Sequence, residues 1–176
     1  MLSFLKKFLP KKQSKIIIIA AIQNDRGIGY QDNLIHHIKK DMQHFVNQTT
    51  GHTVVMGRKN WETIPEKFRP FKNRQSIIIT RNKNYTAAGA LVTHSLEEAI
   101  IKASSEKIYI IGGGEIYKQV LAYADTLDLT IINANKPADT FFPEFENKFK
   151  VVQSSEEMYD EESHTSYIFT VWEKKK

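Results

Sequence analysis

Glycines at one expected strand-to-helix junction could bind an anion. Gly112, Gly113 and Gly114 follow an apolar run that ends at Ile111, and a helical pattern comes next. Free backbone N–H groups and the dipole at a helix start favour a phosphate, and glycines let it approach the backbone. A tight turn without a ligand is the alternative. Because residue 117 is Tyr, the segment is not G-x-G-x-x-G, so a Rossmann domain is not supported.

Two further segments carry cations after an expected strand. Arg58 and Lys59 follow Gly57 at the opening of a short helix, and Thr80 and Arg81 end the next strand. A guanidinium or ammonium in such a place suits a phosphate group, whereas its default role is that of a solvated surface charge. Together with the glycines, these residues predict a grip on a pyrophosphate and one extra phosphate.

Asp41 is the carboxylate most indicative of a ligand pocket. It lies on the turn between Ile38 and Met42, near the apolar face of the first expected helix. A carboxylate near a core face needs a partner. Asp41 is therefore either a polar residue at the edge of that face or the base of a pocket that accepts paired hydrogen bonds from an amidine-like ligand edge.

The sequence has no pattern for nucleophilic or metal-assisted catalysis. There is no cysteine, which excludes disulfides and thiolate chemistry, and no Ser/His/Asp arrangement stands out. The six histidines lack the usual spacing of metal ligands, so no metal site is expected. His37 and His44 are expected to be solvated.

Composition and charge indicate one globular domain. The chain has 176 residues, of which 41% are hydrophobic and 26% charged. Its formal net charge is +5, but residues 1–15 hold five lysines and no acid, so the remainder is neutral. A neutral body argues against a nucleic-acid partner. The apolar run 16–22 is too short to span a bilayer and reads as a buried strand.

Residues 1–15 are expected to form a basic amphipathic extension. On a helical wheel the apolar residues among positions 1–9 share one arc, Lys6 and Lys7 lie on the other, and Pro10 ends the pattern. No cleavage site for export follows, so a cytoplasmic protein is expected. The extension is either disordered or packed on the body, or it docks to a membrane surface or a protein.

From residue 16 onward, short β-branched runs alternate with helical patterns, which predicts an α/β fold with a largely parallel sheet. Strands are expected at 16–22, 53–56, 76–80, 90–93, 107–111, 127–134, 149–155 and 165–172. Longer helices are expected at 38–50, 96–103 and 115–124. An apolar stripe supports the first of them (Ile38, Met42, Phe45 and Val46), and a capping box of Ser95 and Glu98 supports the second.

The order of these features resembles dihydrofolate reductase over residues 16–173. After the first strand and Asp41 come Val55-Met56-Gly57-Arg58, Ile64-Pro65-Glu66-Lys67-Phe68-Arg69-Pro70, Ile111-Gly112-Gly113-Gly114 and Asp139-Thr140-Phe141-Phe142-Pro143. The resemblance implies one domain over 16–176, with an eight-stranded mixed sheet, parallel except for its last strand, and four flanking helices. It also implies NADPH-dependent reduction of 7,8-dihydrofolate to 5,6,7,8-tetrahydrofolate, with hydride transfer to pterin C6 and protonation at N5, in one-carbon metabolism.

The same resemblance implies the substrate site. Asp41 matches the carboxylate that holds the pterin 2-amino group and ring N3, and Thr130 is expected to hydrogen-bond to Asp41. Arg74 matches the arginine that binds the α-carboxylate of the folate glutamate, a task suited to a planar guanidinium. The other expected substrate contacts are Ala21, Phe45, Ile64, Phe71 and Ile111. Antifolates such as methotrexate are expected in this pocket, and the protein is expected to be a monomer.

The cofactor site follows from the resemblance as well. Arg58 and Arg81 favour NADPH over NADH, and Tyr117 is expected to pack beside the nicotinamide. The other phosphate contacts match Lys59, Asn60 and Thr80. The remaining cofactor positions match Ala21, Ile28, Gly29, Gly57, Ile111, Gly112, Gly113, Gly114, Glu115 and Ile116. The bond between Gly112 and Gly113 matches a cis peptide of the family.

One position departs from the family pattern. The family usually has Leu-Pro-Trp or Met-Pro-Trp where this chain has Leu34-Ile35-His36. We expect His36 to act at the catalytic site as a polar, water-binding substitute for the indole, or else to slow or alter turnover. Two alternatives remain: a related pyrimidine reductase of riboflavin synthesis on the same fold, and a non-catalytic NADPH-binding protein.

Overall fold

The computed structural model describes residues 14–175. Most of the expected N-terminal extension, residues 1–13, lies outside this range, and its expected amphipathic character is not addressed by the structure. Lys15, the last residue of that segment, already belongs to the first strand, β1 (Lys15–Gln23). The first strand therefore begins one residue before the apolar run 16–22.

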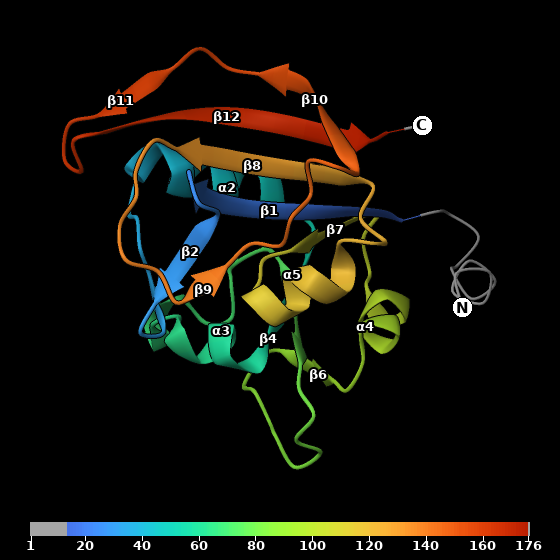
Figure 1. The fold of residues 1–176 in the computed structure, drawn as a ribbon. Helices are drawn as coiled ribbons and strands as arrows, with labels where there is room; N and C mark the ends of the chain where they lie inside the picture. Colours follow the sequence, from blue (N-terminus) through green and yellow to red (C-terminus); the bar gives the residue numbers. More distant parts are fainter. Residues whose placement is uncertain (1–13, 176) are drawn as a thin grey trace.

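Nine strands form the main sheet (Figure 1). They are β1, β4 (Thr53–Gly57), β5 (Gln75–Ile79), β6 (Leu91–Thr93), β7 (Lys107–Ile110), β8 (Thr126–Ile132), β10 (Phe149–Ser154), β11 (Met158–Asp160) and β12 (Thr165–Lys174). Their order is β10-β12-β8-β1-β7-β4-β5-β6, and β11 also pairs with β12. Because β10 and β11 share the outer edge of β12, the sheet has eight positions. The pairs are parallel except those of β12, which confirms the expected mixed sheet.

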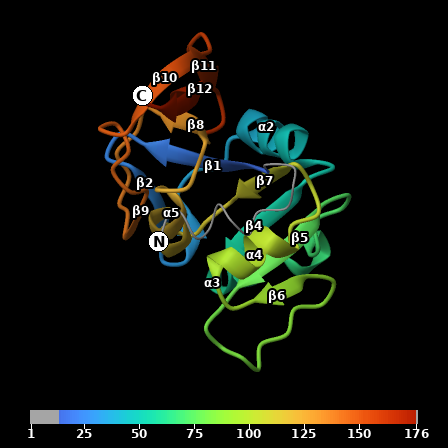
Figure 2. The same ribbon diagram turned by 90° about the vertical axis from the view of Figure 1, so that its right-hand side faces the viewer.

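Four α-helices are present among residues 14–175. They are α2 (Lys39–Thr49), α3 (Arg58–Thr63), α4 (Leu96–Lys102) and α5 (Gly114–Val120), and a short 3-10 helix, η1, spans Glu66–Phe68. Figures 1 and 2 show α2 and α5 on opposite sides of the sheet. The helix expected at 115–124 is shorter than predicted, because residues 121–123 form a turn.

The alternating side chains of β1 build two cores. Ile16, Ile18, Ala20 and Ile22 pack in one cluster with residues of α4 and α5. Ile17 and Ile19 face the other side, where Trp61 of α3 joins them. Burial on both faces is typical of a central strand in a parallel sheet and explains why the whole run is apolar. The strand therefore lies between a layer that contains α4 and α5 and a layer that contains α3.

A second, three-stranded sheet was not predicted. It consists of β3 (Asn33–Leu34), β2 (Gly27–Tyr30) and β9 (Thr140–Phe141), in that order. These strands have two to four residues, too few for a periodic pattern to be recognised. The sheet ties the loop after β1 to the segment between β8 and β10 (Figure 1).

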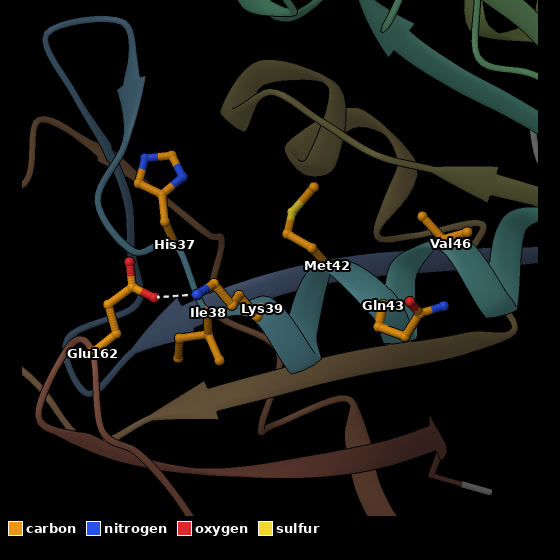
Figure 3. Close-up of a pocket in the computed structure, with 7 residues that line it drawn as sticks. All are labelled: His37, Ile38, Lys39, Met42, Gln43, Val46 and Glu162. Atoms are coloured by element: carbon orange, nitrogen blue, oxygen red, sulfur yellow. Dashed lines mark ion pairs between the residues drawn. The ribbon is translucent and has the colours of Figure 1, made fainter.

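The apolar stripe predicted for α2 is only partly correct. Ile38, at the start of the helix, is 1% exposed, and Phe45 packs on the core, but Met42 and Val46 are 47% and 38% exposed. Met42 and Val46 border an open groove of about 330 Å³, which Figure 3 shows along the start of α2. The helix instead turns polar side chains toward β8, because that strand offers them partners. None of the predicted site residues lines this groove.

Candidate active site

The predicted site residues meet at the carboxyl ends of adjacent parallel strands. β1, β7, β4 and β5 are neighbours in the sheet and end near Ala21, Ile111, Gly57 and Thr80, respectively. Backbone bonds tie two of these ends together, since Gly57 N donates to Gly112 O at 2.8 Å and Ile111 N donates to Val55 O at 2.9 Å. Ligands of open α/β sheets bind at this edge.

Asp41 lies on the first turn of α2, and the expected hydrogen bond to Thr130 is present. Thr130 Oγ1, on β8, donates to Asp41 Oδ1 over 2.6 Å, and Thr130 is only 2% exposed. Burial raises the pKa of Asp41, while the hydrogen bond from Thr130 and the charge of His44 act to lower it. Thr130 occupies one carboxylate oxygen, which leaves the other for the N–H groups of a ligand.

Four of the expected apolar substrate contacts form one wall. Phe45, Ile64, Phe71 and Ile111 are partly buried and pack against the same core cluster. The rings of Phe45 and Phe71 meet edge to face, with centroids 5.7 Å apart. Ala21, the fifth, packs with a different cluster, around Ile38.

Arg74 is held beside this wall. Its guanidinium carbon lies 4.6 Å from the centroid of the Phe71 ring and 5.6 Å from that of Phe45. Its Nη1 donates to Thr49 Oγ1 over 3.0 Å, and its Nε donates to Lys72 O over 3.2 Å. Burial lowers the pKa of Arg74. A guanidinium is planar and charged in proteins, so these contacts hold a planar cation in a fixed position.

The glycine segment has the geometry that the resemblance implied. The peptide bond between Gly112 and Gly113 is cis, and Gly112 has φ +107°, which a side chain would strain. An added Cβ there would also lie 3.1 Å from the ring of Tyr117. Tyr117 is buried and donates its hydroxyl hydrogen to Ile19 O over 3.0 Å. Its ring is thus fixed against the glycine backbone.

The expected phosphate side has the features that a dinucleotide needs. Helices α3 and α5 begin after Gly57 and Gly113 without a side-chain cap, so their first N–H groups are available to an anion. A Cβ added at Gly113 would meet nothing within 4 Å, so the backbone there is approachable. Lys59 and Arg81 are exposed nearby along the chain.

Other predicted cofactor residues make contacts within the protein. Arg58 Nη1 lies 3.1 Å from both carboxylate oxygens of Glu62. Asn60 Nδ2 donates to Ile111 O over 2.8 Å, which joins α3 to the end of β7. Glu115 is exposed and pairs with Lys118 over 3.1 Å. Thr80 is buried, and its Oγ1 accepts from Asn82 N over 3.2 Å.

Two positions, Ile28 and Gly29, lie in β2 and are carried to the site by the small sheet. Ile28 is partly buried against the core on the α5 side, and Ile116 of α5 belongs to that same cluster. The loop after β1 therefore reaches the helix that follows the glycines.

His36 lies in the segment between β3 and α2 and contacts a residue that was not predicted. Its Nε2 lies 3.0 Å from Oε1 of Gln23, which is 0% exposed. Because an amide oxygen only accepts, Nε2 carries the hydrogen and Nδ1 is an acceptor. Burial, with help from Lys136 and His37, lowers the pKa of His36 to about 4, so the ring is neutral at neutral pH. Within the described chain, Nδ1 is buried without a partner, which suits a water-binding role.

The expectation for His44 was wrong. His37 is exposed as predicted, but His44 is half-buried and its Nε2 lies 2.9 and 3.1 Å from the two oxygens of Asp128. Asp128 was missed because a single acid inside an apolar strand gives no motif. The signal that could have identified the pair is spacing: His44 follows Asp41 by one helical turn, and Asp128 precedes Thr130 by two strand positions.

The described residues include no group of three His, Asp or Glu side chains that could hold a metal ion. Over residues 14–175, no helix is long and apolar enough to cross a membrane.

Comparisons with known proteins identify the family of this chain. Residues 15–174 match the family model described as dihydrofolate reductase. The chain is 35% identical over 162 residues to dihydrofolate reductase of Bacillus subtilis, which covers 91% of this chain and 95% of that protein. It is 40% identical over 133 residues to the enzyme of Neisseria gonorrhoeae, covering 75% and 81% of the two chains.

A solved structure supports the same assignment. Dihydrofolate reductase from Enterococcus faecalis, complexed with NADP(H) and RAB-propyl, superposes with a TM-score of 0.84 at 29% identity, covering 93% of this chain and 98% of that one. Both the fold and nearly the full length of the sequence match this family. The chain belongs to the dihydrofolate reductase family.

Proposed function

We propose that this protein reduces 7,8-dihydrofolate to 5,6,7,8-tetrahydrofolate with NADPH, using the residues gathered at the carboxyl edge of the sheet. The observation that carries the assignment of the site is the partly buried Asp41 carboxylate, oriented by the hydrogen bond from Thr130 over 2.6 Å. Family membership supports the reaction, and the positions of the side chains support the roles given below.

Asp41 orients the substrate. A carboxylate with one oxygen held by Thr130 and one oxygen free can accept the N–H groups of the pterin 2-amino group and ring N3. Burial makes the ionised form costly, and a ligand that supplies two hydrogen bonds offsets that cost. Asp41 thereby sets the pterin plane and favours protonation at N5 through the negative charge that it brings close to the ring.

Arg74 and the apolar wall hold the remainder of the substrate. Phe45, Ile64 and Phe71 give the benzoyl group a surface to pack on, and the fixed guanidinium of Arg74 suits bidentate binding of the glutamate α-carboxylate. No covalent step involves the protein, so its contribution is orientation, exclusion of water and electrostatics.

The residues around the glycines fit NADPH. The uncapped helix starts after Gly57 and Gly113 suit its pyrophosphate, and Arg58 and Arg81 suit the additional phosphate of NADPH. When bound, NADPH supplies the hydride that reaches pterin C6. The Tyr117 ring, fixed by its bond to Ile19, shapes the wall on which the nicotinamide packs.

His36 is proposed to hold water near the substrate. Its Nδ1 is a buried acceptor, and its ring cannot itself deliver a proton at neutral pH because its pKa is about 4. The proton for N5 would therefore come from water, and the imidazole would orient that water.

The decisive assay follows the absorbance of NADPH on mixing with dihydrofolate. Wild type should oxidise NADPH only when dihydrofolate is present, and Asp41→Asn should lose activity by a factor of about a hundred or more. Wild-type inactivity would overturn the proposal, as would an active Asp41→Asn variant. Tight methotrexate binding separates this function from a pyrimidine reductase on the same fold, which lacks a folate-type pocket.

We further propose that the protein acts as a monomer in the cytoplasm. The absence of cysteine fits a reducing compartment. Sedimentation of the full chain tests the monomer. Comparison of full-length protein with a chain beginning at Lys15, by co-sedimentation with anionic liposomes, tests whether the N-terminal extension docks to membranes.

A further inference from the structure

A second contact, parallel to the one at Asp41, joins α2 to β8. Asp41 and His44 are one turn apart on α2, and Thr130 and Asp128 are two residues apart on β8. Residues with these spacings share a face of a helix and of a strand. The two elements are therefore linked by two rungs: Thr130 to Asp41 over 2.6 Å, and His44 to Asp128 over 2.9 and 3.1 Å.

The second rung is largely buried. The side chains of His44 and Asp128 are 21% and 10% exposed. A second strand fixes the imidazole as well, since the Phe169 ring of β12 stacks on it with centroids 4.4 Å apart and planes 24° from parallel. Phe169 lies directly opposite Thr130 in the sheet. The position of His44 is thus fixed by its own helix α2, by Asp128 of β8 and by Phe169 of β12.

The charges of His44 and Asp128 act on the Asp41 carboxylate in opposite directions. The hydrogen bond to Asp128 raises the pKa of His44, although burial works against it. The charge of His44 acts to lower the pKa of Asp41, whereas the charge of Asp128 acts to raise it. The other titratable groups whose charge couples to Asp41 are the Tyr117 and Tyr167 hydroxyls, which burial keeps neutral. The pKa of Asp41 therefore depends on two opposite charges, those of His44 and Asp128.

We propose that His44 is a positioning residue for dihydrofolate reduction: it docks α2 on β8 beside Thr130, and its charge balances that of Asp128 next to the Asp41 carboxylate. The inference rests on the proposed function of Asp41. His44 makes no bond to the reacting groups, and its effect passes through the carboxylate. A buried ion pair often adds little stability compared with apolar packing. Stability alone therefore does not account for the pair of His44 and Asp128, whereas an effect on the Asp41 carboxylate does.

The test is a double-mutant cycle that compares wild type with His44→Gln, Asp128→Asn and the double variant. Both substitutions remove a charge but keep a side chain that can hydrogen-bond. Carbon-13 NMR of aspartate-labelled protein gives the pKa of Asp41, identified by the signal lost in Asp41→Asn. His44→Gln leaves Asp128 unbalanced and should raise that pKa by about one unit. Asp128→Asn removes the repelling charge and should lower it. The double variant should return it close to the wild-type value.

Kinetics give the second readout. The pH at which kcat/KM for dihydrofolate declines on the acid side should move in the same directions as the Asp41 pKa, and the double variant should restore it. Equal pKa values in all four proteins would overturn the proposal, as would a double variant that departs further from wild type than either single one. If His44→Gln does not fold, the downward shift in Asp128→Asn decides alone. A wild type without reductase activity contradicts the proposed function instead, and the NMR cycle remains interpretable.

Discussion

Gln23 and His36, thirteen residues apart, share one hydrogen bond that ties the end of β1 to the segment before α2. Gln23 Oε1 lies 3.0 Å from His36 Nε2 and also accepts from Lys136 N over 3.0 Å, while Gln23 Nε2 donates to Lys136 O over 2.7 Å. One buried amide therefore connects β1, the segment before α2 and the segment after β8. A substitution of Gln23 therefore tests all three connections at once.

Replacing this amide should destabilise the protein. Gln23→Leu keeps the size of the side chain but leaves the Lys136 backbone and the His36 ring without their partners, at a cost of about 1–3 kcal/mol in the free energy of unfolding. Urea unfolding measures it. Gln119→Leu, on the exposed side of α5, is the matched control and should change stability by less than about 0.5 kcal/mol. Equal stabilities of the two variants would contradict a bridging role for Gln23.

His36 should make stability depend on pH in acid. Its folded pKa of about 4 lies below the ordinary histidine pKa of 6.5, so the unfolded chain binds the proton more readily. The stability contribution is therefore complete above pH about 6.5 and is lost as the pH falls toward about 4. His36→Gln should flatten the decline in melting temperature across this window. The exposed His37→Gln should leave the decline unchanged, and a steep decline that persists in His36→Gln would refute the assignment.

Asp41→Asn should raise stability while it abolishes activity. Burial raises the pKa of Asp41 in the folded protein. Its contribution to the free energy of unfolding is therefore complete below its unfolded pKa and is lost as the pH rises through the folded pKa. The amide avoids this cost and can still accept from Thr130. The gain, about 1–2 kcal/mol, should be larger at pH 8 than at pH 5 in thermal melts. A variant less stable than wild type at pH 8 would contradict this account.

Arg74→Lys should weaken substrate binding more than turnover. Lysine keeps the charge but loses the planar group that lies over Phe71 and binds a carboxylate through two donors. We expect KM for dihydrofolate to rise about tenfold or more, with a smaller change in kcat. Arg69→Lys, whose guanidinium lies over Trp61, serves as the control and should leave KM close to wild type.

Arg81→Ala should reduce the preference for NADPH. Arg58 already pairs with Glu62 over 3.1 Å, whereas Arg81 is exposed and available to a phosphate. We expect KM for NADPH to rise about tenfold and KM for NADH to change little. The exposed Lys83→Ala controls for a general loss of positive charge. A parallel rise in both KM values would exclude a role for Arg81 in choosing between the cofactors.

The regular elements and the ordered motifs could be predicted from the sequence because each has a local signal. The buried run of β1, the glycines before α5 and the Ser95 cap of α4, which accepts from Glu98 N over 3.1 Å, all depend on neighbours in the chain. The capping box itself is displaced by one residue, since Glu98 accepts from His94 N rather than from Ser95 N. Such details depend on the exact turn of the backbone.

The unpredicted parts depend on contacts across the fold. The orientation of α2 is set by Thr130 and Asp128 on β8, more than 80 residues away. The apolar stripe of the helix therefore does not show that Met42 and Val46 are exposed. Gln23 becomes a bridge only because the segment after β8 passes over it. A helical wheel contains no information on either partner.

The small sheet bears on the order in which the molecule is completed. Gln31 N donates to Asp139 Oδ2 across 108 residues, and β2 pairs with β9 in the same place. During synthesis β2 and β3 can pair with each other, but β2 lacks its other partner, β9, until most of the chain has left the ribosome. A nascent or truncated chain that stops before residue 139 could build much of the sheet and still lack a closed ligand site. Competence to bind ligand therefore reports that translation has reached the last quarter of the chain.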